Sequence, residues 1–90
     1  MLEKRTLTIT NVRGLHARAS RKLAEIALRH EAHVIVRRDG EEADARSLMD
    51  LMMLGAGIGS EIEVEAHGAD AKQAVDAIEA LVVDKFHEGE

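Results

Sequence analysis

The stretch Gly14-Leu15-His16-Ala17-Arg18-Ala19-Ser20 marks the first change of pattern in the chain. Residues 6–10 alternate apolar and polar side chains, as strands do, whereas apolar residues recur at helical spacing from Ala19 onward. No Ser, Asp or Asn directly precedes Ala19, so the first backbone N–H groups of the predicted helix need another partner. We expect an anion there, because these N–H groups and the helix dipole favour negative charge. His16 would then stand at the helix start as a nucleophile or base, with Arg18 as its charge partner, an arrangement suited to a phosphoryl group carried on histidine.

Strand and helix patterns alternate through the rest of the chain. Asp39-Gly40 is a strong hairpin signal, and Ile62, Val64 and Ala66 alternate with glutamates, which indicates a strand with one buried face and one face in water. The predicted strands span 6–10, 32–38, 41–44 and 61–66. The predicted helices begin near Ala19, at Ser47 and after Asp70.

Two of these helices carry N-cap signals. Ser47 is followed three residues later by Asp50, and Asp70 by Gln73, which is the spacing of a capping box. The last helix is expected to bury an apolar stripe made of Ala74, Val75, Ile78, Leu81, Val82 and Phe86.

Strands with one wet face and amphipathic helices indicate an α+β fold. We predict an open-faced β-sandwich of order β-α-β-β-α-β-α, with a four-stranded antiparallel sheet covered by helices on one face. The chain has 90 residues, enough for one modest core and too few for two, so residues 1–90 are expected to form a single domain.

Composition excludes several classes of protein. Apolar residues make up 46% of the chain, which argues against disorder. The chain has no cysteine, so neither a disulfide framework nor a thiolate metal site can form, and a reducing compartment is favoured. We expect a cytoplasmic protein, because no apolar run is long enough to span a membrane and no signal peptide is apparent.

Charge is divided unevenly along the chain, whose net charge is −5. Residues 1–38 hold nine Lys and Arg against three Asp and Glu, whereas residues 39–90 hold three against fourteen. The basic side chains near His16 are either a solvated helix face or a field that steers an acidic or phosphorylated partner. Nucleic acid is not expected as a partner, because the second half is acidic and Phe86 is the only aromatic residue. The basic residues concerned are Arg13, Arg18, Arg21, Lys22 and Arg29.

Two motifs carry a resemblance to a known family. Gly14-Leu15-His16-Ala17-Arg18 resembles the active-site signature of HPr, the histidine-containing phosphocarrier of the phosphoenolpyruvate-dependent phosphotransferase system. Arg46-Ser47-Leu48-Met49, followed by residues 51–55, resembles the second signature of that family, around its regulatory serine. The similarity extends over essentially the whole chain, including the separation of the two motifs.

The resemblance implies a role for each matching residue. His16 would accept a phosphoryl group through Nδ1 from phosphorylated enzyme I and pass it to a histidine on an enzyme IIA-type acceptor, with Arg18 helping to hold or release the group. Ser47 would be the target of a regulatory serine kinase or phosphorylase. Partners would dock on an apolar patch made of Leu48, Met49, Met52 and Met53, beside Arg21 and Lys22.

The resemblance also implies a carrier with no independent turnover and no cofactor or metal, serving sugar uptake or a regulatory nitrogen and carbon relay. We expect a monomer. One departure stands out, since the family has Pro directly after the Arg, where this chain has Ala19. Proline presets φ for the first helical turn, so Ala19 is expected to change rates or partner preference without abolishing function.

Several alternatives stay open at this stage. The chain could instead be an HPr-like regulatory binding module that acts through the phosphorylation state of Ser47, or Ser47 could be an N-cap alone. Two further functions are disfavoured, namely a small hydrolase with His16 as general base and a metal chaperone. A metal site formed by the pair His30 and His33 is also disfavoured. One or two of the three methionines in the patch are expected to lie in the core.

Overall fold

Strand β4, Glu61–His67, is one of the two inner strands of the sheet, and its alternating sequence buries one face completely. Ile62, Val64 and Ala66 are at most 1% exposed, and they pack beneath the helices. The computed structural model describes residues 1–89 and arranges the strands in the order β1-β4-β2-β3, with every neighbouring pair antiparallel. The other strands are β1 (Leu2–Thr8), β2 (His33–Arg38) and β3 (Glu41–Asp44).

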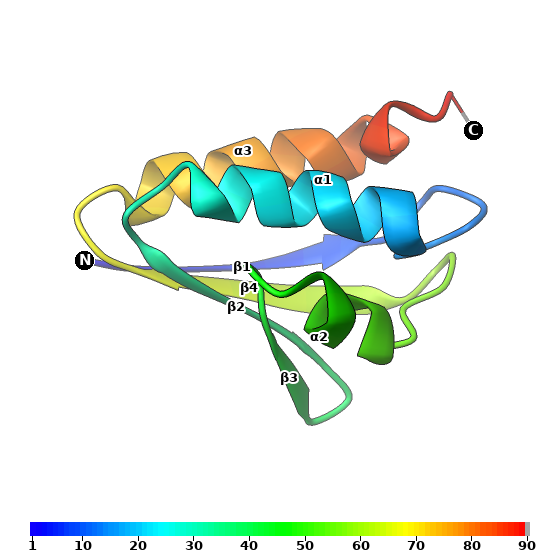
Figure 1. The fold of residues 1–90 in the computed structure, drawn as a ribbon, viewed down its shortest axis with the longest axis horizontal. Helices are drawn as coiled ribbons and strands as arrows, with labels where there is room; N and C mark the ends of the chain where they lie inside the picture. The colour runs from blue at the N-terminus through cyan, green and yellow to red at the C-terminus, as the bar shows by residue number, and fades with distance from the viewer. Residues whose placement is uncertain (90) are drawn as a thin grey trace.

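Three α-helices lie on one side of this sheet (Figure 1). They are α1 (Ala17–Leu28), α2 (Leu48–Met53) and α3 (Ala71–Val83), and a short 3-10 segment, η1 (Lys85–His87), follows. The predicted α+β open-faced sandwich and its element order are therefore confirmed. The Asp39-Gly40 hairpin is also confirmed, with both residues at positive φ (51° and 83°), as a tight turn of this kind requires.

The first strand and the first helix begin earlier than the sequence indicated. β1 begins at Leu2 and ends at Thr8, because residues 2–8 pair along the whole length of β4. Ile9, placed in this strand by the alternation, lies beyond it and is fully buried, and its N–H donates to the Ser60 carbonyl at 2.8 Å. α1 begins at Ala17, two residues before the predicted Ala19.

The last helix differs from the prediction at both ends. Asp70 does not cap α3 with its side chain; its carboxylate instead accepts hydrogen bonds from the N–H groups of Glu31 (3.0 Å) and Ala32 (2.8 Å) in the α1–β2 loop. Phe86 is fully buried as expected, but it lies in η1 at φ 55° and not on the α3 stripe. Helix α3 ends at Val83, three residues before Phe86, but the Phe86 side chain is still buried in the core.

The methionines of α2 are not part of the core. Met49, Met52 and Met53 are 66%, 39% and 74% exposed, whereas Leu51 of the same helix is fully buried. The expectation that one or two of these methionines would be buried is wrong, because a helix of six residues at the sheet edge presents only one narrow side to the core.

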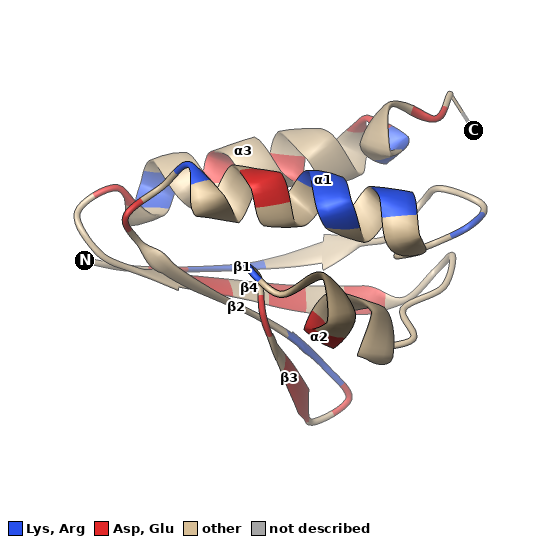
Figure 2. Ribbon diagram, in the orientation of Figure 1, with Lys and Arg blue, Asp and Glu red and all other residues tan. Residues whose placement is uncertain are grey.

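Charged residues occur in all four strands of the sheet (Figure 2). Glu65, expected in water, is only 8% exposed, because cationic side chains from both neighbouring strands cover it. Arg37 and His67 hydrogen-bond its carboxylate, and Lys4 Nζ lies 3.7 Å away. The hydrogen bonds from Arg37 and then His67 lower the pKa of Glu65 from 4.5 to about 2.

None of the helices within residues 1–89 has the length and apolar character needed to cross a membrane.

We expect Glu65→Gln to lower the urea midpoint of unfolding at pH 7, because the neutral amide leaves Arg37 and Lys4 without their shared carboxylate. The folded-state pKa of Glu65 lies below its ordinary value, so the stabilisation is complete above about pH 4.5 and is lost as the pH falls toward about 2. The difference between variant and wild type should therefore shrink over that interval in urea titrations. The exposed Glu41, changed to Gln, is the control, and a pH-independent difference for Glu65→Gln would contradict this account.

Candidate functional site

The loop that carries His16 is held against the loop between α2 and β4. Gly14, at φ +64°, packs directly on the backbone of Ala56 and Gly57, and the N–H of Leu15 donates to the Ala56 carbonyl at 2.9 Å. Asn11, which is fully buried, donates from Nδ2 to the Gly14 carbonyl at 2.9 Å. The start of α1 is thus fixed by backbone contacts between two loops at one end of the sheet.

We expect Gly14→Ala to destabilise the fold strongly, since the added Cβ would lie 2.4 Å from the Ala56 carbonyl oxygen. The left-handed φ alone costs an L-residue about 1–2 kcal/mol. Gly57→Ala is a matched control in the facing loop, because a Cβ there meets no atom within 4 Å. Thermal unfolding should show a large loss of Tm for the first variant and little change for the second. Equal losses of Tm in the two variants would contradict this account, because they would show that Gly14 contributes loop flexibility and not close packing.

His16 is itself the N-cap of α1. Its Nδ1 accepts a hydrogen bond from the N–H of Arg18 at 3.3 Å, and its backbone is extended. The first N–H groups were expected to need a partner other than Ser, Asp or Asn. One of them, that of Arg18, is bonded to the imidazole of His16, which here replaces the usual hydroxyl or carboxylate. The bond is long, so it places the Nδ1 lone pair at the helix N-terminus without holding it tightly.

The other ring nitrogen of His16 faces the C-terminal segment. Nε2 lies in hydrogen-bond contact with the Glu88 carboxylate, and the second oxygen of Glu88 accepts from Asn11 Nδ2 at 3.0 Å. With Nδ1 accepting and the carboxylate beside Nε2, the neutral ring carries its proton on Nε2. Burial raises the pKa of Glu88, but the hydrogen bonds from His16 and Asn11 outweigh it, so the net pKa is lowered and the carboxylate is charged.

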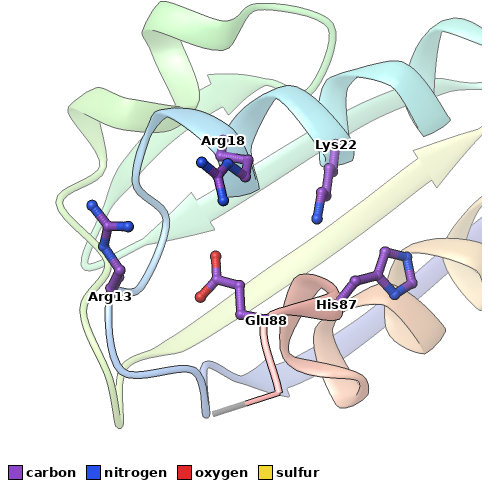
Figure 3. Close-up of a pocket in the computed structure, with 5 residues that line it drawn as sticks. All are labelled: Arg13, Arg18, Lys22, His87 and Glu88. Atoms are coloured by element: carbon purple, nitrogen blue, oxygen red, sulfur yellow. The ribbon is translucent and has the colours of Figure 1, made fainter.

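Basic side chains surround this carboxylate. Arg13, Arg18 and Lys22 line a cleft of about 290 Å³ together with His87 and Glu88. Figure 3 shows Arg18 pointing toward the Glu88 carboxylate, with Arg13 and Lys22 on either side of it. Lys22 Nζ also donates to the Phe86 carbonyl at 2.6 Å. The predicted basic cluster is therefore only partly brought together, since Arg21 and Arg29 are exposed and do not line this cleft.

Ser47 lies where the sequence placed it, as the N-cap of α2. Its Oγ accepts from the N–H of Asp50 at 3.2 Å, although Asp50 does not return a bond to the Ser47 N–H, which donates to the Asp44 carbonyl. α2, which carries the apolar patch, packs beside the first half of α1 (Figure 1). His16 is the N-cap of α1, so it lies near the patch. The patch consists of Leu48, Met49, Met52 and Met53.

Two residues of the site escaped the sequence analysis. Glu88 is 72 positions from His16 and 77 from Asn11, so no local spacing connects them. The only feature of the sequence that could have pointed to Glu88 is that it follows Phe86, an aromatic residue expected to be buried, near the end of the chain. Residues 1–89 contain no group of three or more His, Cys, Asp or Glu side chains that could hold a metal ion. His30 Nδ1 lies 2.8 Å from the Ile26 carbonyl, and His33 lies in β2.

Comparison with known proteins identifies the family. Residues 3–84 match the family described as "PTS HPr component phosphorylation site". Phosphocarrier protein HPr of Cupriavidus necator is 48% identical over 90 residues, 100% of each chain. Phosphocarrier protein NPr of Escherichia coli strain K12 is 43% identical over 89 residues, 98% of this chain and 99% of that one. The crystal structure of HPr-C-His from Thermoanaerobacter tengcongensis is 31% identical, with a TM-score of 0.92 over 96% of this chain and 97% of that chain.

The open-faced fold and these matches define the class of protein, a phosphocarrier of the phosphotransferase system. Within that class, the chain belongs to the HPr family, whose members here include proteins named HPr and NPr. The resemblance inferred from the two motifs is thereby confirmed.

Proposed function

We propose that His16 is the residue that carries the phosphoryl group, which it accepts on Nδ1 from phosphorylated enzyme I and gives to a histidine of an enzyme IIA-type acceptor. The observation that supports this assignment best is the position of Nδ1 at the N-terminus of α1, where it accepts a hydrogen bond from the Arg18 N–H. The relay would serve sugar uptake or a regulatory nitrogen and carbon pathway, and the protein would act in the cytoplasm as a monomer.

The local chemistry favours this role. A neutral imidazole nitrogen is a competent nucleophile near neutral pH. When Nδ1 attacks phosphorus, the Arg18 N–H loses its partner and becomes available to a phosphoryl oxygen, together with the positive end of the helix dipole. Arg18, Arg13 and Lys22 supply positive charge from the cleft. Protein partners would bring their own reactive histidines to this cleft.

The incoming partner would dock on the apolar patch beside His16. Flexible methionine side chains adapt to different surfaces, which suits a carrier that meets a donor and an acceptor in turn. Lys22 and Arg21 flank the start of α1 and would attract acidic partner surfaces. No cofactor is needed, because the phosphoryl group moves directly between histidines.

We expect intact mass spectrometry to show one phosphoryl adduct after incubation with phosphoenolpyruvate and enzyme I from the same organism. The adduct should be acid-labile, stable in alkali and absent from His16→Ala. His30→Ala, which changes a different surface histidine, should retain the adduct. An unmodified wild type in the presence of active enzyme I, or an adduct that survives in His16→Ala, would contradict the assignment.

A second candidate function rests on Ser47. Its hydroxyl caps α2 and is half-buried at the edge of the apolar patch, so a phosphate there would add charge where partners dock. On this reading the chain is a regulatory binding module controlled by a serine kinase or phosphorylase. The two functions are compatible, but they predict different effects of substitution at Ser47.

We expect Ser47→Asp to retain the cap of α2 and to weaken binding to enzyme I, because docking would have to desolvate a carboxylate beside the patch. A roughly tenfold rise in Kd corresponds to about 1.4 kcal/mol, which titration calorimetry resolves. Ser47→Ala is the converse control: it should lower stability by about 1 kcal/mol and leave the Kd unchanged. An unchanged Kd for Ser47→Asp would remove the basis for regulation through this serine.

A further inference from the structure

The carboxylate of Glu88 is held in a defined position beside His16. One oxygen contacts Nε2 of His16, and the other accepts from Nδ2 of the buried Asn11 at 3.0 Å. The Glu88 side chain is 12% exposed. Since Asn11 is also bonded to the Gly14 carbonyl, the same amide connects the tail to the loop that carries His16.

The backbone that delivers Glu88 adopts a costly conformation. Lys85, Phe86 and His87 have φ values of 53°, 55° and 65°, in the left-handed region, where the Cβ of an L-residue lies too close to the following carbonyl oxygen. Two features offset this cost, namely the complete burial of Phe86 and the hydrogen bond from Lys22 to its carbonyl. Strain of this kind persists only where surrounding contacts fix it, and it is concentrated at functional sites.

We propose that Glu88 is a positioning residue for phosphoryl transfer: its carboxylate keeps the proton of His16 on Nε2 and stabilises the imidazolium that exists once Nδ1 carries the phosphoryl group. This inference rests on the proposed function, because it describes the ring on which the phosphoryl group would reside. Glu88 lies outside residues 3–84, which match the family description, although HPr of Cupriavidus necator aligns with all 90 residues.

The transfer step balances without a proton acceptor. The Nδ1 lone pair of His16 forms a bond to phosphorus, and the bond from phosphorus to the nitrogen of the donor phosphohistidine breaks, with its electron pair returning to the donor ring. The Nε2 proton stays in place, so the His16 ring becomes a cation. Glu88 lies at the opposite nitrogen from the phosphoryl group, where a carboxylate stabilises the cation as in a Ser-His-Asp triad.

The same charge helps the second transfer. A protonated phosphoimidazole leaves phosphorus as a neutral ring when the acceptor histidine attacks, whereas an unprotonated one would have to leave as an anion. The other charged groups that face the site are Arg13, from the loop after β1, and Arg18 and Lys22, from α1. His87 lies in the same cleft but pairs with Asp84. Glu88 is the one carboxylate among the five residues that line the cleft.

The test is a pH titration of phosphorylated His16 by ³¹P NMR, in full-length wild type and in Glu88→Gln, Glu88→Asp and Glu41→Gln. Thermal unfolding first checks that each variant is folded. Removing an opposite charge in contact with an imidazolium lowers its titration point by about one pH unit. We expect that acid shift in Glu88→Gln, partial recovery in Glu88→Asp, and no change in Glu41→Gln, which removes one exposed carboxylate from the far hairpin.

The outcomes separate the two proposals. If the variants are phosphorylated on His16 and Glu88→Gln titrates at the same pH as wild type, the inference about Glu88 is overturned while the proposed function stands. If Glu41→Gln shifts as much as Glu88→Gln, net charge and not position is responsible, and the inference is again overturned. If wild type forms no His16 adduct, the proposed function fails and this inference fails with it.

Discussion

The contact between Gly14 and the backbone of Ala56 and Gly57 is the constraint on which the site depends. It joins the loop that begins α1 to the loop that begins β4, so the position of His16 is set by an inner strand of the sheet. A side chain at position 14 would separate the two loops, and the ring would lose its fixed relation to the helix N-terminus. Precision at the site therefore comes from backbone packing, which varies little with solvent conditions.

Electrostatic balance is the second feature of the site. The basic cleft attracts a phosphoryl group, but an unopposed cluster of Arg13, Arg18 and Lys22 would also disfavour a cationic ring at His16. The Glu88 carboxylate resolves this conflict by lying beside Nε2, while the backbone N–H of Arg18, at the helix N-terminus, faces Nδ1. The two ring nitrogens are thus placed in environments of opposite sign, which one imidazole needs in order to be first a nucleophile and then a leaving group.

The sequence predicted the elements well and their ends less well. Alternation in β4 and the Asp39-Gly40 hairpin were sufficient for the sheet, because periodicity and turn chemistry are local. The Asp70 carboxylate accepts from the N–H groups of Glu31 and Ala32, some forty positions earlier in the chain, and not from those at the start of α3. Local sequence spacing cannot reveal which of these two sets of N–H groups the carboxylate binds. The motif also placed His16, but its contact with Glu88 depends on a left-handed turn that has neither glycine nor asparagine to signal it.

The division between what the chain provides and what its partners provide explains the exposed apolar residues. A phosphohistidine that passes its group to another protein cannot be enclosed, so the shell that excludes water must come from the partner. Met49 and Met53 are exposed, and under the proposed function they would offer adaptable contact area to both the donor and the acceptor. Glu88 and Asn11 complete the part of the site that does not change with the partner. A carrier must keep its ring chemistry constant while its surroundings alternate, and here the chain's own C-terminal turn meets that requirement.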